Sequence, residues 1–133
     1  MERNNTNSDS SHLCPPDWIY IYKKCYSFSE KKMTYLEMNS ATFGCRLASI
    51  PETLISLRRL IAITRQDFWV GMDRHSSNDT WMAKWRDGSM EKVLKGDGSC
   101  IKLGRDLKYE NCYSKLLWIC ERDAKETTKD ALL

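Results

Sequence analysis

Cysteine is the residue type in this chain whose number and spacing could do chemistry. No two cysteines form a Cys-x-x-Cys pair, and only His12 and His75 could add imidazole ligands, so the pattern does not indicate a zinc site. An even number of cysteines in a small chain instead predicts a disulfide framework, which belongs in an oxidising compartment. The six cysteines are Cys14, Cys25, Cys45, Cys100, Cys112 and Cys120.

Catalytic chemistry is not indicated by the remaining polar residues. His75 lies in a polar stretch without a nucleophile beside it, and Asp87 and Asp97 are explained as turn residues. The chain contains no P-loop, zinc motif or nucleophile elbow. A net charge of +3 without a run of Lys and Arg does not indicate nucleic-acid binding. We therefore expect a protein that is not an enzyme and needs no cofactor.

The composition predicts one soluble domain with polar ends. Of the 133 residues, 41% are hydrophobic and 29% are charged, which is typical of a globular protein. We expect a flexible leader or stalk remnant over 1–13, a folded domain over 14–122 and a polar tail over 123–133. The sequence shows no signal peptide and no transmembrane run, although sequons at Asn4 and Asn78 fit an extracellular glycoprotein. We therefore expect a secreted protein, or a cell-surface ectodomain whose type II anchor lies in a missing N-terminal segment.

Two strands and a helix are predicted in the first third of the domain. Alternating apolar residues predict strands on both sides of a turn at Lys23-Lys24, so that a bridge from Cys14 to Cys25 is geometrically natural. A helix is predicted over 34–43, because Thr34 and Glu37 form a capping box. Its expected apolar face consists of Leu36, Ser40 and Phe43, and Gly44 is expected to end it.

A second helix and several short strands follow. The helix is predicted from an N-cap at Ser49 to about Thr64, with Leu54, Leu57 and Ile61 on its apolar face. Strands are predicted over 68–72, from Cys100 onward and over 116–119, with turns at 86–89 and 96–98. We expect a polar loop over 73–80 and irregular chain over 90–95. Two helices followed by strands that cysteines connect indicate an α+β domain.

Several short motifs follow one another along the chain. They are Cys14-Pro-x-Asp-Trp18, Lys24-Cys25-Tyr26-x-Phe28-Ser29, Leu47-Ala48-x-Ile50, Phe68-Trp69-Val70-Gly71, Trp85-x-Asp87-Gly88-Ser89, Cys100 and Cys112 followed by Trp118-Ile119-Cys120. In this order they resemble the C-type lectin-like domain of natural killer cell receptors and of activation-type lymphocyte surface proteins. The resemblance extends from Cys14 to Arg122 and implies that fold, with two helices and small antiparallel sheets.

The resemblance also implies a disulfide pattern. It pairs Cys14 with Cys25 and Cys100 with Cys112, and it adds a long bridge from the first helix to Cys120. When Leu47-Ala48-x-Ile50 is aligned without gaps, the family's helix cysteine falls on Ser40, and Met33 replaces a usual tryptophan. We expect Cys45 to take the place of that cysteine and pair with Cys120. The alternative is that Cys45 and Cys120 stay free or pair between chains.

Calcium-dependent sugar binding is not expected. Sugar-binding members of the family coordinate calcium through a Glu-Pro-Asn or Gln-Pro-Asp loop and a Trp-Asn-Asp strand, whose oxygens converge on one point. Here no such triplet occurs between Ser89 and Cys100, and the strand before Cys112 is Leu107-Lys-Tyr-Glu-Asn111, which has a lysine where carboxylates are needed.

The resemblance implies a protein partner instead. Partners of the family dock on the strands around the Trp-x-Asp-Gly turn and on the last long strands. That surface is basic here, which suits an acidic or mixed partner, and Tyr109 or Arg105 is its expected centre. The residues expected on it are Lys84, Arg86, Glu91, Lys92, Lys102, Arg105, Lys108, Tyr109 and Glu110.

The leading hypothesis is therefore a calcium-independent immune recognition module, receptor or ligand, that binds a protein on another cell. The resemblance also implies a homodimer, formed through an edge strand or the second helix. One alternative is a glycan-binding lectin whose non-standard site includes Trp81 and Trp85. Another is a soluble or viral decoy, which would suit the divergence at Met33, Ser40 and Cys45.

Overall fold

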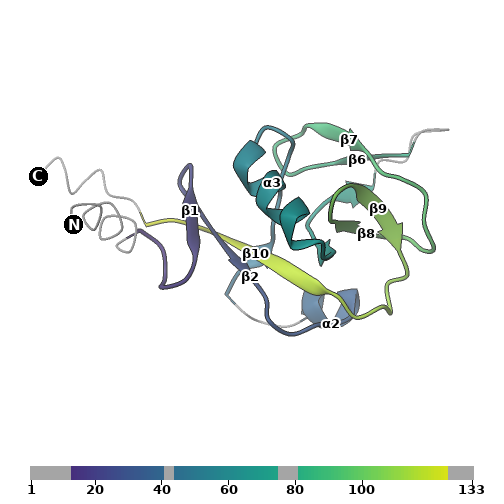
Figure 1. Ribbon diagram of the computed structural model, residues 1–133, viewed down its shortest axis with the longest axis horizontal. Coiled ribbons are helices and arrows are strands. Elements are labelled where there is room, and N and C mark those ends of the chain that lie inside the picture. Colours follow the sequence, from purple (N-terminus) through teal and green to yellow (C-terminus); the bar gives the residue numbers. More distant parts are fainter. Residues whose placement is uncertain (1–12, 41–43, 75–80, 126–133) are drawn as a thin grey trace, which may run out of the picture.

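A long central strand organises the fold. The computed structural model describes residues 13–40, 44–74 and 81–125. In this part of the chain the large sheet has the order β1-β2-β10-β4-β8-β9, and β3 pairs with β10 on the edge opposite β2. Figure 1 shows β10 (Leu117–Asp123) running from the core to the β1–β2 hairpin. The other strands of this sheet are β1 (Ile19–Ile21), β2 (Lys24–Phe28), β3 (Arg46–Leu47), β4 (Phe68–Trp69), β8 (Cys100–Leu103) and β9 (Leu107–Glu110).

A second, smaller sheet covers the opposite end of the molecule. It consists of β5 (Asp73–Arg74), β6 (Met82–Lys84) and β7 (Met90–Lys92), all antiparallel. The described residues contain two helices, α2 (Tyr35–Ser40) and α3 (Ile55–Thr64). Among the strand pairs of the described ranges, only β4 with β10 is parallel. Two helices with small, mostly antiparallel sheets confirm the predicted α+β class.

The predicted hairpin at the start of the domain is confirmed. Ile21 pairs with Lys24, so the turn consists of Tyr22 and Lys23, one residue earlier than predicted. Their φ angles of 45° and 69° are left-handed, as the twist of a two-residue hairpin turn requires.

The capping box of α2 is confirmed, but its predicted apolar face is wrong. The Thr34 amide donates to Glu37 Oε1 (2.9 Å), and the Glu37 amide donates to Thr34 Oγ1 (3.1 Å). Leu36 is 53% exposed, whereas Met38 is 3% exposed and packs in the core. The helix is short and contacts the domain through one side, and that side contains Met38. Phe43 and the side chain of Ser40 lie outside the described residues, and Gly44 has the expected left-handed φ of 71°.

The second helix begins later than predicted. α3 begins at Ile55 and has no side-chain cap, because Ser49 is used elsewhere. The Ser49 amide donates to Glu121 Oε1 (2.8 Å), and its hydroxyl accepts from the Arg86 amide (3.1 Å). The predicted apolar face is confirmed, since Leu57 and Ile61 are buried and Leu54 packs against the core. The helix ends at Thr64, as predicted.

The chain after α3 forms more strand than predicted. The predicted strand over 68–72 is shorter, because only Phe68–Trp69 pairs. Asp73–Arg74, predicted as loop, pairs with β6, and Met90–Lys92, predicted as irregular, forms β7. The turn over 86–89 is confirmed, with Asp87 Oδ1 accepting from the Ser89 amide (2.8 Å).

Two glycines here allow close backbone approaches. A Cβ on Gly71 would lie 2.5 Å from the Leu47 carbonyl oxygen, and one on Gly96 would lie 1.9 Å from that of Tyr109. A side chain at either position would therefore push two packed segments apart.

All six cysteines are paired. The bonds are Cys14–Cys25, Cys45–Cys120 and Cys100–Cys112, so Cys45 does take the partner role predicted for it. Cys120 and Cys100 are buried with Trp69 and Trp118 in one of two core clusters. Among the described residues, no helix is long and apolar enough to cross a membrane.

The three disulfides should differ in their contribution to stability according to the loops that they close. Cys45–Cys120 closes 75 residues and Cys14–Cys25 closes 11. In the chain-entropy treatment these loops correspond to about 4 and about 3 kcal/mol. We expect the double variant Cys45→Ala/Cys120→Ala to lose more free energy of unfolding than Cys14→Ala/Cys25→Ala in denaturant titrations. An equal or reversed order would contradict this, and peptide mapping without reduction checks the pairing itself.

Candidate functional site

The smaller sheet presents an outward surface of lysines and methionines. Met82 lies opposite Lys92 and Lys84 lies opposite Met90, so the four side chains share one face of β6 and β7. The residue between Met82 and Lys84 is Ala83, which is buried in the core. Lys84, Met90 and Lys92 are exposed and Met82 is half-buried. In the described structure, neither lysine has an acidic side chain within ion-pair distance. We call Met82, Lys84, Met90 and Lys92 the β6–β7 face.

A groove runs along the edge of the β6–β7 face. It has a volume of about 450 Å³, and Met82, Met90 and Lys92 form one side of it. Leu94, which is exposed, and Arg105 continue this lining toward the β8–β9 turn, while Glu52 and Asp106 add negative charge. The groove thus combines apolar side chains with charges of both signs.

The floor of the groove is rigid. Arg58 from α3 forms a two-pronged ion pair with Glu91, with distances of 3.0 Å and 2.8 Å between nitrogen and oxygen. The Glu91 carboxylate also accepts from Trp85 Nε1 (2.9 Å). Glu91, predicted on the partner surface, therefore connects α3 to the smaller sheet.

Two other predicted surface residues, Lys102 and Glu110, are partly exposed but paired within the domain. The Lys102 ammonium lies 2.8 Å from Glu110 and 3.0 Å from Asp67, which connects β8, β9 and the chain before β4. Hydrogen bonds from Lys102 and then from Ser114 lower the pKa of Glu110 below its usual value. Lys102 and Glu110 are therefore engaged with each other and with neighbouring side chains, and a partner would have to displace these contacts to bind them.

Tyr109 is not a surface anchor. It is 4% exposed and belongs to the main core cluster. Its ring makes an edge contact with Trp81 at 5.6 Å, and the Arg74 guanidinium lies 5.4 Å from its centre. The prediction that Tyr109 is the centre of the surface is therefore wrong, because the alternation of β9 directs it inward, with Leu107.

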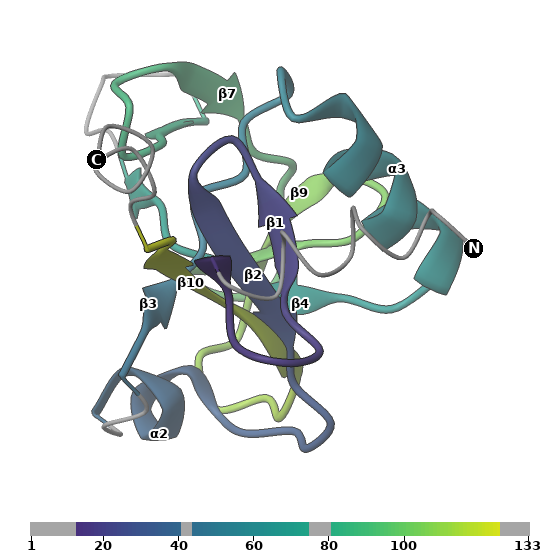
Figure 2. The same cartoon turned by 90° about the vertical axis from the view of Figure 1, so that its left-hand side faces the viewer.

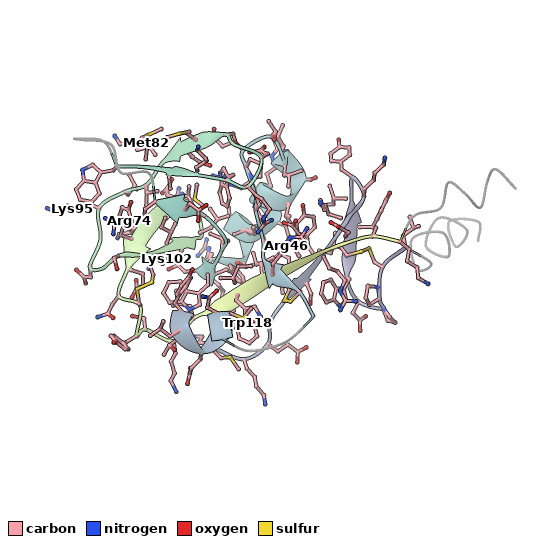
Figure 3. The ribbon with its side chains drawn as sticks, turned by 180° about the vertical axis from the view of Figure 1, so that it is seen from behind. Arg46, Arg74, Met82, Lys95, Lys102 and Trp118 are labelled. Carbon is pink, nitrogen blue, oxygen red and sulfur yellow. A yellow bond between two sulfur atoms is a disulfide. The ribbon has the colours of Figure 1, made fainter. Side chains whose placement is uncertain are left out.

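The exposed members of the predicted set do not all share one surface. Lys84, Lys92 and Arg105 lie on or beside the β6–β7 face. Lys108 is exposed on β9 opposite Lys102, on the outward side of the other sheet. Figure 3 shows Arg74, Met82, Lys95 and Lys102 at the end of the molecule opposite the β1–β2 hairpin.

The last predicted member, Arg86, belongs to a buried ionic cluster. Glu121 on β10 is 2% exposed, and its Oε2 accepts from Arg46 (2.8 Å) and from Arg86 (3.2 Å). Its Oε1 accepts from the Ser49 amide, and Arg86 also donates to the Leu47 carbonyl (2.8 Å). Arg86 therefore joins the turn over 86–89 to β3 and β10. The predicted glycosylation sites Asn4 and Asn78 lie outside the described residues.

Comparison with known proteins agrees with this architecture. The sequence family described as the lectin C-type domain matches residues 31–122. The chain belongs to this family. The killer cell lectin-like receptor subfamily B member 1A of Rattus norvegicus is 30% identical over 133 residues, covering 90% of this chain and 58% of that protein. The NKG2-D type II integral membrane protein of Sus scrofa is 29% identical over 123 residues, covering 80% of this chain and 53% of that protein.

A solved relative has the same fold. The cow CD23 carbohydrate-recognition domain superposes with a TM-score of 0.63 at 22% identity, over 86% of this chain and 99% of that domain. This lectin-like chain spans little more than half the length of the two receptors above. The recognition from short motifs is thereby confirmed.

The residues at the expected calcium position do not fit that ion. Glu110 is engaged by Lys102 and Ser114, and Asn111 Oδ1 accepts from the Tyr113 amide (2.8 Å). Lys108 places a positive charge on the same strand. Within the described ranges, no three His, Cys, Asp or Glu side chains converge as a metal site would need.

Two features of the site were missed in the sequence. The lysines and methionines of β6 and β7 alternate on both sides of the turn over 86–89, and this pattern would have predicted a hairpin with one Lys/Met face. The Glu121 cluster carries no such local signal, because Glu121 is separated from each of its partners by 35 or more residues.

Glu121→Gln should destabilise the domain strongly. The amide would turn a donor toward Arg46 or Arg86 and leave both guanidinium groups without their shared anion. We expect a loss of about 2–3 kcal/mol, below the full cost of breaking a buried pair because both arginines reach solvent. Denaturant unfolding measures this loss. Glu52→Gln, an exposed acid, is the control, and equal effects of the two changes would contradict the role of Glu121.

Proposed function

We propose that this domain is an extracellular recognition module that binds a protein partner through the β6–β7 face without calcium. The observation that carries the proposal is the pair of exposed lysines, Lys84 and Lys92, that alternate with Met82 and Met90 and have no ion-pair partner in the described structure. Exposed apolar side chains among uncommitted charges are typical of interaction sites.

The chemistry of the surface indicates the chemistry of the partner. Acidic side chains facing Lys84 and Lys92 would be attracted during encounter, which raises the rate of association. An apolar side chain between Met82, Met90 and Leu94 would displace water from the groove. Methionines adapt to differently shaped apolar groups, so this surface suits a partner side chain with no fixed shape.

The proposal of calcium independence is supported by the side chains at the expected calcium position, whose oxygens already accept hydrogen bonds or form ion pairs. Any ion at Glu110 and Asn111 would have to displace Lys102, Ser114 and the Tyr113 amide. The names of the two receptors above support the proposed location, since one is a killer cell receptor and the other a type II integral membrane protein. We infer a cell-surface ectodomain anchored by a preceding segment of a longer protein.

A glycan site built from two tryptophans has no support in the geometry. Trp81 is exposed, but Trp85 is 1% exposed and its Nε1 is bonded to Glu91. The two indoles therefore cannot form one sugar-stacking surface in this structure.

Charge reversal on the face should slow partner association. The domain is screened by surface plasmon resonance against a panel of recombinant lymphocyte surface proteins and, separately, on a glycan array. For a protein that binds, Lys84→Glu/Lys92→Glu should lower the association rate about tenfold at low salt, and Met90→Ala should mainly speed dissociation.

The controls distinguish an effect of the β6–β7 face from an effect of the charge of the whole domain. At a physiological ionic strength, Lys31→Glu, an exposed lysine between β2 and α2, should leave the rates within about twofold, because the Debye length is then about 8 Å and a charge outside the β6–β7 face is screened. EDTA should leave binding unchanged. Binding of glycans alone, or rates unaffected by the changes on the β6–β7 face, would overturn the proposal.

We also propose that two copies associate through the outer side of α3. Ile55 and Ile63 are 60% and 74% exposed, and with Arg59 between them they lie along one side of the helix. Such exposed isoleucines are stabilised when another copy covers them, and a symmetric helix pair buries each patch against its equivalent.

The dimer is tested by sedimentation. Ile55→Glu/Ile63→Glu should convert a dimer to a monomer without loss of thermal stability, because neither side chain packs in the core. Leu36→Glu, an exposed leucine on α2, is the control and should leave the dimer intact. A monomeric unaltered domain at high protein concentration would contradict the proposal.

A further inference from the structure

A second pocket lies beside the turn over 86–89, on the side of the β1–β2 hairpin. Its volume is about 480 Å³ and it opens between the tip of the β1–β2 hairpin and the segment that leads into α3. Figure 2 shows the hairpin in front of β10 with this segment beside its tip. The family motifs account for the fold around this pocket but assign it no ligand. It has about twice the volume of the pocket beside Arg46 and Gly71, which is about 240 Å³, and it has no role in the proposed function.

The floor of this pocket has hydrogen-bond donors to spare. Tyr26 is 3% exposed, lines the pocket, and donates no hydrogen bond to any described residue. Burial and then the charge of Glu121 raise the pKa of Tyr26 to about 12, so the phenol keeps its proton at neutral pH. The Ser49 hydroxyl accepts from the Arg86 amide and has its own proton free among the described contacts.

The carboxylates that line the pocket already accept hydrogen bonds. Glu121 accepts from Ser49, Arg46 and Arg86, and Asp87 Oδ1 accepts twice from Ser89. The hydroxyls of Tyr26 and Ser49 line the same pocket with their protons unused among the described contacts, so a ligand that brings an acceptor replaces water at these donors. A charged acceptor gains more from this exchange than a neutral one.

Two cations, Lys24 and Arg86, line the pocket and balance the charges of Glu121 and Asp87. Lys24 uses one of its three ammonium protons on Asp123 (2.7 Å), and Arg86 uses two guanidinium protons on Glu121 and Leu47. Both keep protons for a further anion. The upper walls are apolar, because the ring of Tyr22, Pro51 and Leu54 line them.

We propose that this pocket binds an organic carboxylate with an apolar body. The carboxylate accepts from Tyr26 and from Arg86 or Lys24, and the body packs against Tyr22, Pro51 and Leu54. A small acid in solution and an acidic group at the end of a peptide carry the same chemistry. The inference is independent of the proposed function. Among the residues that line the pocket, only Arg86 belonged to the predicted partner surface.

The probe for this site is 3-phenylpropionate, titrated into the isotope-labelled domain and followed by amide chemical shifts. Two matched probes separate its parts: 3-phenylpropan-1-ol keeps the body without the charge, and acetate keeps the charge without the body. We expect saturable shifts at the hairpin tip and around Ser49 with phenylpropionate, and affinity at least about fivefold weaker for the alcohol and acetate. A peptide ending in phenylalanine, with a free or an amidated C-terminus, tests the second source.

Two variants test the assigned contacts. Tyr26→Phe removes only the hydroxyl and should weaken phenylpropionate about fivefold, while Tyr20→Phe on the same hairpin, outside the pocket lining, should change it less than about twofold. Thr53→Trp, an exposed change at the pocket wall, should abolish the shifts without unfolding the domain, and it serves if Tyr26→Phe does not fold. The proposal is overturned by absence of saturable shifts, by shifts elsewhere, by equal affinity for the alcohol, or by unchanged affinity in either pocket variant. Loss of partner binding on the β6–β7 face would leave this outcome unaffected.

Discussion

The structure depends on one buried carboxylate. Glu121 lies in the middle of β10, and its two oxygens hold the Ser49 amide, Arg46 of β3 and Arg86 of the turn over 86–89. Three segments far apart in the sequence, over 46–49, 86–89 and β10, therefore meet at one acidic group. Because an unpaired charge at this depth is costly, the cluster forms only when all of these segments are in place, which makes the position of β10 specific.

From β10 the molecule divides into two ends with different surfaces. Toward the hairpin, Asp123 binds Lys24 and Arg46, and the pairing of β10 with β2 carries the sheet outward. Hydrogen bonds from Lys24 and then Arg46 lower the pKa of Asp123 to about 2, so these contacts hold down to acidic pH. Toward the other end, the parallel pairing of β10 with β4 leads to β8 and β9, on which the smaller sheet rests. The core between them lets the two surfaces serve separate ligands.

The sequence predicted the fold well but predicted the candidate site only in part. The pairs Cys14–Cys25 and Cys100–Cys112 followed from a resemblance, because short motifs place these cysteines in the chain. The motifs put the third partner on Ser40, and its role was transferred to Cys45, which does pair with Cys120. Residues on the predicted partner surface were assigned from their position in strands, and this assignment failed where a charge found an internal partner. Glu91 and Lys102 are charged residues that connect elements, and Tyr109 packs in the core. No one-dimensional pattern distinguishes a lysine with an acid across the sheet from one without.

By itself the sequence determined the features whose partners lie within a few residues. The Thr34–Glu37 capping box, the turn closed by Asp87 and Ser89, and the hairpin near Lys23 each satisfy their own backbone groups locally. Only the tertiary structure decided that Ser49 serves Glu121 instead of capping a helix, and that Met38 instead of Leu36 faces the core. These outcomes depend on which donor, acceptor or apolar surface from a distant part of the chain packs beside a residue. The register of β10 places Glu121 beside Ser49, more than seventy residues away in the sequence.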